Sequence, residues 1–214
     1  MKKIKRPLTY LMGLSILGLA VTLMQKTNLG MNSWDALNRN FYYGIPIDYR
    51  YLTPIVALVL ITFAYIIEKR KFDIKFFFPL VISFYIGLVI DLLLLVIPDV
   101  TQMSIVYNLI YVFLAIIFIA IGLNMIIICN YPLPALDQFC LAISKRYKIT
   151  FGKGKLIGEV IALVGTLIVG LIFKHQEFYF YIGPTTIIGL VFIGFFVDLL
   201  AKPVRIFLGE NSVN

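Results

Sequence analysis

Six long apolar runs alternate with short polar segments along the chain. A helix needs about 20 apolar residues to cross the roughly 30 Å hydrocarbon layer of a membrane. The runs are continuous, whereas the strands of a membrane barrel alternate apolar and polar residues over about ten positions. The pattern therefore predicts an all-α integral membrane protein with six transmembrane helices, at residues 8–25, 51–67, 76–97, 105–129, 156–173 and 178–201.

The composition leaves little room for a soluble domain. Apolar residues make up 61% of the chain and charged residues 14%, whereas soluble domains carry about 25% charged residues. We therefore expect residues 1–214 to form a single membrane domain, with the lipid bilayer as its main partner.

The net charge of +8 does not indicate nucleic-acid binding, because the basic residues occur in short clusters between apolar runs rather than on one folded basic surface. Basic residues concentrate in the cytoplasmic loops of membrane proteins. With six spans, nearly all Lys and Arg residues fall on one side, which predicts a plasma-membrane protein with both termini in the cytoplasm. The exceptions among the 19 are Lys26, Arg39, Arg50 and Lys174.

The two halves of the chain resemble each other. Gly87 and Asp91 in the third span correspond to Gly194 and Asp198 in the sixth. A Gly-x-x-x-Asp spacing at matching places is a stronger signal than shared apolar residues, because membrane helices draw on a small set of residue types. The sequence therefore predicts a repeat with halves at about 7–98 and 105–203.

Each half also contains a short amphipathic or re-entrant helix between its first two spans. One carries the stripe Trp34, Leu37 and Phe41, and an acidic residue lies near the start of each helix, Asp35 in the first and Asp137 in the second. Because each half crosses the membrane three times, the second half must enter from the opposite side. A 3+3 inverted repeat is typical of transporters, with binding sites near the bilayer midplane between the halves.

These motifs resemble those of the bacterial YczE/YitT family of small membrane proteins. The segment Asn-Leu-Gly-Met-Asn-Ser-Trp-Asp-Ala-Leu at 28–37, the Gly-Leu-Val-Ile-Asp at 87–91, Asp137, the Gly-Lys-Gly-Lys at 152–155 and Glu159 carry the resemblance. It covers about residues 7–203 and is closer to the YczE branch, since no cytoplasmic domain is expected after the last span. The Pro-Leu-Pro at 132–134 departs from the small residues usual in the family. The resemblance implies the fold class more than an activity.

Five acidic residues are the candidates for binding a substrate or a proton: Asp35, Asp137, Asp91, Asp198 and Glu159. A charged side chain at the centre of a membrane helix costs about 2.5–3.5 kcal/mol on insertion scales and is a functional candidate for that reason. Structural roles are the alternatives: pairing of Asp198 with Lys202, an interfacial position for Asp91, and favourable first-turn positions for the other three. If the acids line a cavity, it is acidic and favours a cation or a proton-coupled solute.

Other polar positions have simpler interpretations. Asn124 is expected to form a hydrogen bond between helices, and the glycines of the spans are expected to allow close helix packing. The Gly-Lys-Gly-Lys at 152–155 lacks the spacing of a phosphate-binding loop and is expected to anchor the fifth span against anionic headgroups. Cys129 and Cys140 lack metal-ligand spacing.

The sequence favours a multi-pass transporter of a small solute or ion. The alternative is a membrane accessory protein that supports a partner complex without transport. No catalytic constellation is recognisable, so we expect no enzymatic activity, cofactor or metal. A polar cavity lined by the acids would distinguish the transporter from the accessory protein, whose interior should be dry.

Overall fold

The structure is a computed structural model that describes residues 5–45, 49–174 and 181–209. Within these residues the chain forms eight α-helices and one 3-10 turn, and its only β contact is an isolated bridge between Met31 and Ile182. The elements are α1 (Lys5–Gln25), α2 (Ser33–Gly44), α3 (Tyr49–Glu68), η1 (Ile74–Phe77), α4 (Phe78–Leu94), α5 (Ile105–Cys129), α6 (Ala135–Tyr147), α7 (Phe151–Ile172) and α8 (Pro184–Phe207).

The all-helical prediction is confirmed, and four helices are long and apolar enough to cross a membrane: α1, α5, α7 and α8. The apolar parts of α3 and α4 are shorter, at Pro54–Glu68 and Phe78–Leu94. The predicted span 105–129 coincides with α5, whereas α7 begins five residues before the predicted 156. The sixth predicted span begins at 178, outside the described residues, and α8 itself begins at Pro184.

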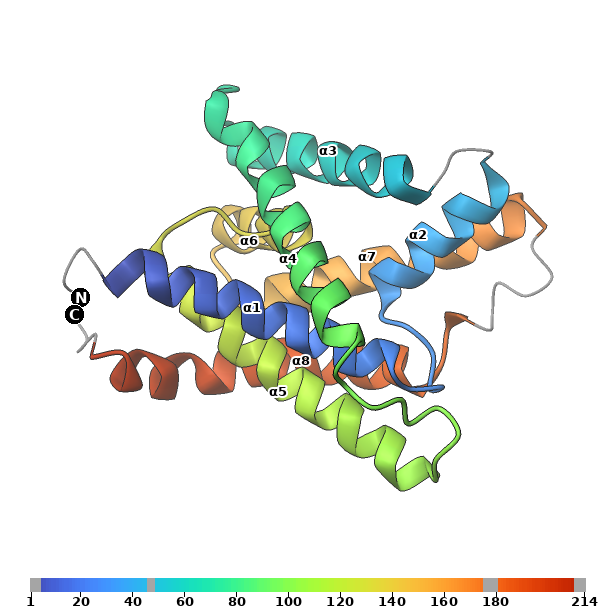
Figure 1. Cartoon of the computed structure of the whole chain (residues 1–214). Helices are drawn as coiled ribbons and strands as arrows, with labels where there is room; N and C mark the ends of the chain where they lie inside the picture. The colour runs from blue at the N-terminus through green and yellow to red at the C-terminus, as the bar shows by residue number, and fades with distance from the viewer. Residues whose placement is uncertain (1–4, 46–48, 175–180, 210–214) are drawn as a thin grey trace.

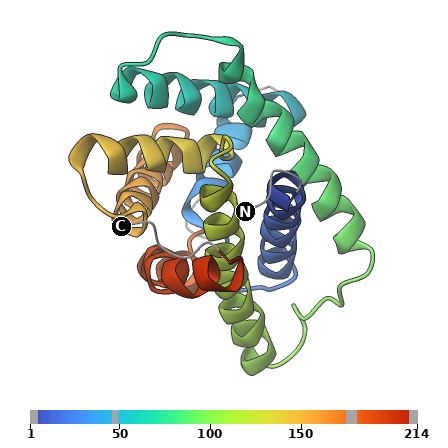
Figure 2. The same ribbon diagram turned by 90° about the vertical axis from the view of Figure 1, so that its left-hand side faces the viewer.

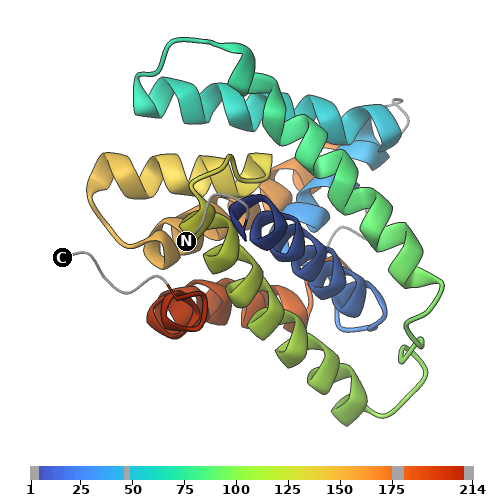
Figure 3. The ribbon, with the colours of Figure 1, turned by 60° about the vertical axis from the view of Figure 1, so that its left-hand side comes forward.

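Three long helices form one side of the molecule. α1 and α5 run antiparallel and pack along each other, and α8 packs against α5 (Figure 1). α4 crosses the outer side of α1, as the rotated view in Figure 3 shows. The first turn of α1 and the last turn of α8 lie at the same end of the molecule (Figure 1).

The remaining helices pack around α7. α2 and α6 both contact α7, and α6 also contacts α3, which lies at the edge of the molecule farthest from α8 (Figure 2). The stripe of α2 faces this core as predicted, since Trp34 and Leu37 are buried and Phe41 is partly buried. Trp34 also meets Phe139 of α6 edge to face, with ring centroids 6.4 Å apart. The two short helices therefore meet inside the bundle.

A close approach at two glycines and a hydrogen bond between helices hold the long helices together, as expected. The backbones of α1 and α5 approach each other at Gly13 and Gly122, where a Cβ on Gly122 would lie 2.8 Å from the Gly13 carbonyl oxygen. Asn124 of α5 donates a 2.8 Å hydrogen bond to the carbonyl oxygen of Val197 in α8. This bond confirms the predicted interhelical role of Asn124.

Candidate functional site

A lysine lies at the centre of the charged residues in the protein interior. The Lys155 ammonium is 2.7 Å from Asp137 Oδ1 and 3.3 Å from Glu159 Oε1. All three residues are buried, with 5%, 7% and 3% of their surface exposed. A buried charge is costly unless it is paired, so each of these groups depends on the others.

Glycines on α7 bring α6 close enough for this pairing. A Cβ on Gly154 would lie 2.6 Å from the carbonyl oxygen of Cys140, and one on Gly158 would lie 2.5 Å from the Cys140 sulfur. Gly154 and Gly158 are four positions apart and so lie on one face of α7, and Gly158 also lies three positions after Lys155. The close approach places Asp137, in the first turn of α6, beside Lys155.

Asp35 extends the cluster from the other short helix. Asn32 caps α2 by accepting hydrogen bonds from the backbone N–H groups of Trp34 and Asp35, and its side-chain amide donates a 2.7 Å hydrogen bond to Asp35 Oδ2. The Asp35 carboxylate is repelled by Glu159 and attracted by Arg39 and Lys155. The structure thus brings together three of the five predicted acids: Asp35, Asp137 and Glu159.

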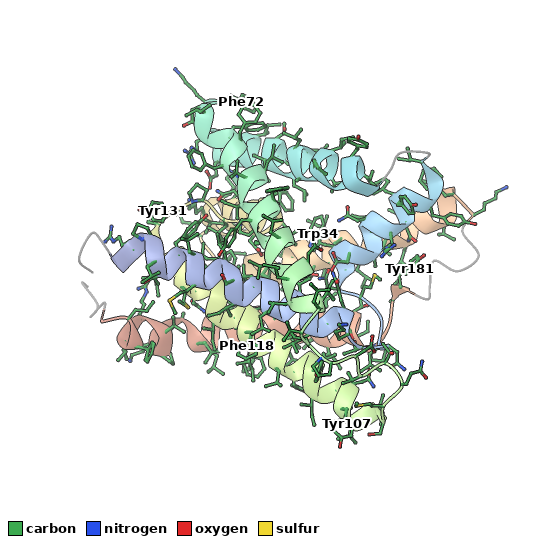
Figure 4. The ribbon with its side chains drawn as sticks, viewed as in Figure 1. Trp34, Phe72, Tyr107, Phe118, Tyr131 and Tyr181 are labelled. Atoms are coloured by element: carbon green, nitrogen blue, oxygen red, sulfur yellow. The ribbon has the colours of Figure 1, made fainter. Side chains whose placement is uncertain are left out.

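Two polar cavities lie at the starts of the short helices. A cavity of about 340 Å³ is lined by Asn32, Asp35 and Arg39 of the α2 region and by Tyr181. A cavity of about 520 Å³ is lined by Gln138 of α6, Tyr131, Arg70 and Lys145, among others. Tyr181 and Tyr131 lie at opposite sides of the molecule along the direction of α1 (Figure 4). Asp35 lines the first cavity, and Gln138, which follows Asp137 in α6, lines the second.

Asp198 does not join the cluster. Its carboxylate accepts a 2.8 Å hydrogen bond from the backbone N–H of Gly152 and a second from the Thr150 hydroxyl. Thr150 is the residue that caps α7, so Asp198 stabilises the start of that helix. The predicted pairing with Lys202 is wrong, because the carboxylate is engaged with α7 instead.

Asp91 also lies apart from the cluster. It is on the exposed face of α4 and makes no hydrogen bond or ion pair with any described residue. Its surroundings therefore differ from those of Asp198, although the two residues occupy the same place in the sequence motif.

The role of Lys155 was missed in the sequence analysis. The assignment of residues 152–155 to the headgroup region is wrong for Lys155, which is buried. The prediction of an acidic cavity also took no account of this buried cation. Glu159 does not begin a helix either, since α7 starts at Phe151. Gly158 and Glu159 follow Lys155 by three and four residues and so lie on its helix face. Together with Gly154, they are the signal that would have indicated a closely packed, charged contact.

No group of three side chains suited to a metal ion occurs among the described residues. In the cluster, Asp137 and Glu159 each contact the Lys155 ammonium, and Asp35 accepts a hydrogen bond from Asn32.

The chain belongs to a family of proteins of unknown function, DUF6198, whose model matches residues 4–202. No curated protein and no solved structure matches the chain. The resemblance to the YczE/YitT group stays a prediction.

Proposed function

We propose that this protein is a multi-pass plasma-membrane transporter of a small cationic or proton-coupled solute. The observation that carries the proposal is the buried cluster of Lys155, Asp137 and Glu159, with Asp35 beside it, and two polar cavities whose linings include Asp35 in one and Gln138 in the other. A transporter needs a polar site in the interior that is reached from both faces of the membrane.

The charge of the cluster favours a cation or a proton. Asp35, Asp137 and Glu159 contribute three negative charges, and Lys155 and Arg39 contribute two positive charges. With all five groups ionised, the formal charge is −1. One proton or one monovalent cation at Asp35, which lines the cavity, balances this charge in a region where an unbalanced charge is costly.

The packing of the helices supports the 3+3 inverted repeat. Exchanging α1 with α5, α2 with α6, α3 with α7 and α4 with α8 turns every larger helix contact into another packed pair, and only the small contact of α4 with α6 has no comparable counterpart among the described residues. The contact of α4 with α1 becomes that of α8 with α5, and the contact of α3 with α6 becomes that of α7 with α2. The contact of α1 with α5 maps onto itself, so the axis between the halves would pass between these two helices.

The distribution of basic residues supports the proposed orientation, with both termini in the cytoplasm. Lys69 and Arg70 at the end of α3, together with Lys145, Arg146 and Lys148 around the end of α6, line one surface cavity. Figure 1 places the end of α3 at the side of the molecule where α1 begins and α8 ends. A concentration of Lys and Arg at one side is the pattern of a cytoplasmic face.

The accessory role remains the alternative, but the interior of the protein argues against it. A dry, apolar interior would suit a protein that acts only through its outer helix faces. Here the interior holds an ion-paired cluster beside polar cavities, and burying such groups without a use would cost stability.

The test is solute flux in proteoliposomes, screened with protons, monovalent cations and small amines under an imposed pH gradient. We expect flux in the wild type and its loss in Asp35→Asn and Asp137→Asn, with both variants still monodisperse in detergent. Asp99→Asn is the matched control, because Asp99 lies in an exposed loop where it accepts a hydrogen bond from Thr101. Equal flux in all four proteins would remove the proposed site, and absence of flux in the wild type would favour the accessory role.

A further inference from the structure

The two Gly-x-x-x-Asp motifs have opposite environments in this structure. In α8, both motif residues are in contact with the start of α7. A Cβ atom on either Gly194 or Gly152 would overlap the backbone of the other residue, and Asp198 accepts hydrogen bonds from the Gly152 backbone and from Thr150. α8 is therefore docked, backbone against backbone, on the first turn of α7.

In α4, the same two positions are open. A Cβ atom on Gly87 would have no described atom outside its own helix within 4 Å, and Asp91 is exposed without a partner among the described residues. Where α4 does approach α3, Leu80 near the start of α4 packs against a buried cluster that includes Ile61 and Tyr65 in the second half of α3. The face of α4 with Gly87 and Asp91 therefore corresponds to the face of α8 that packs on α7. In this structure the α4 face packs against no other helix at these two positions.

We propose that the protein has a second conformation, in which α4 docks through Gly87 and Asp91 on the first turn of α3. In the same conformation, α8 releases the first turn of α7. This inference rests on the inverted repeat of the proposed function, which relates α4 and α3 to α8 and α7. In one conformation α8 docks on α7, and in the other α4 docks on α3 through the equivalent residues.

The chemistry of a helix start explains why α3 is the partner of this face. The first backbone N–H groups of a helix have no acceptor within the helix, and the helix dipole favours a negative charge at that end. Asp198 already fills this role for α7. Asp91 is the equivalent carboxylate, and a charge exposed on an apolar membrane helix is costly until it finds such a partner.

The change from the α7–α8 contact to the α3–α4 contact would open one cavity and close the other, as alternating access requires. The cavity beside Asp35 is built from the end of α1, the start of α2 and Tyr181. The cavity at the start of α6 includes Tyr65 and Arg70 near the end of α3, and Phe78 and Pro79 at the start of α4. A movement of α4 onto α3 therefore reshapes the second cavity directly, and release of α8 from α7 loosens the helix that carries Lys155.

The test uses a matched pair of substitutions, Gly87→Leu and Gly194→Leu. Gly87→Leu adds a side chain where this structure has space, so we expect the protein to keep the melting temperature and elution volume of the wild type. The same side chain would prevent α4 from docking. Gly194→Leu is the reciprocal change, because it cannot be accommodated in the present α7–α8 contact.

Spin labels report the two contacts in proteoliposomes. One labelled pair is Tyr51→Cys with Leu92→Cys, for α3 and α4, and the other is Ile157→Cys with Leu199→Cys, for α7 and α8. All four positions are exposed, and the native cysteines Cys129 and Cys140 are buried. In an otherwise unchanged protein we expect two distance populations for each pair. Gly87→Leu should remove the shorter α3–α4 distance, and Gly194→Leu should remove the shorter α7–α8 distance.

A smaller substitution, at Asp91, should reduce the docked population without abolishing it. Asp91→Asn keeps the size of the side chain but removes the charge, so the share of the shorter α3–α4 distance should fall about two- to fivefold. A single α3–α4 distance that neither Gly87→Leu nor Asp91→Asn alters would overturn the inference. If both spin-label pairs show two distance populations but no solute flux is measured, the second conformation is supported and the transport function is contradicted. If flux is normal but each pair shows a single distance, only the second conformation is contradicted.

Discussion

The Lys155 ammonium lies 2.7 Å from Asp137 Oδ1, and both side chains have a tenth or less of their surface exposed. The pair joins two consecutive helices, α6 and α7, and Glu159 holds the ammonium from the next turn of α7. A lysine in this position neutralises charge in the interior and fixes the geometry of the two carboxylates.

Removing Lys155 should destabilise the protein more than removing the lysine together with its partner. Breaking a buried ion pair on one side leaves an unpaired charge and costs about 3–5 kcal/mol. We expect Lys155→Met to lower the melting temperature in detergent strongly, and Lys155→Met combined with Asp137→Asn to recover part of the loss. Lys153→Met is the control, because Lys153 is exposed on the same helix. A double variant less stable than Lys155→Met alone would contradict the pairing.

The sequence indicated the helices better than the contacts between them. α5 matches its predicted span because a long apolar run is a local property. The burial of Lys155 is a tertiary property, and the positive-inside rule assigned this residue to the water phase along with its basic neighbours. The contrast between Asp91 and Asp198 was also not predictable, since the same motif is docked in one half and open in the other.

The three acids that lie together in the structure share a local signal in the sequence. Asp35 and Asp137 both lie in the first turn of a short helix, and the predicted inversion brings two such helices together from opposite sides. Glu159 follows Lys155 by four residues, a spacing that places both on one helix face. These relations can be read from the order of residues along the chain. The capping role of Asp198 cannot, because it depends on how α8 packs against α7.

Asp198 and Asp91 should differ in their contribution to stability. Asp198 satisfies the start of α7, and loss of a helix cap costs about 0.5–2 kcal/mol. We therefore expect Asp198→Ala to lower the melting temperature, while Asp91→Ala does not lower it, because Asp91 has no partner among the described residues. Equal losses in the two variants, measured in the same detergent, would show that Asp198 does not act as a cap.

The proposed orientation predicts which engineered cysteines can be labelled in intact cells. Gln102→Cys, in the loop between α4 and α5, should react with a membrane-impermeant maleimide added outside. Lys148→Cys, at the end of α6, should react only after permeabilisation. Both positions are exposed, and the buried Cys129 and Cys140 keep the background low. The reverse pattern would place the termini outside the cell.

Asn124 should contribute to stability through one hydrogen bond between helices. Its side-chain amide donates both to the Ala120 carbonyl within α5 and to the Val197 carbonyl of α8. Hydrogen bonds between membrane helices contribute about 0.6 kcal/mol on average and up to about 1.7 kcal/mol, and Asn124 is buried, so we expect Asn124→Leu to lie at the upper end of that range. Ser15→Ala is the comparison in the other half, where the Ser15 hydroxyl is 2.9 Å from that of Tyr85 and links α1 to α4. Because this contact is only part-buried, its loss should lower the melting temperature less than loss of the Asn124 bond. A larger effect of Ser15→Ala would mean that α4, rather than α8, is the more firmly held of the two helices.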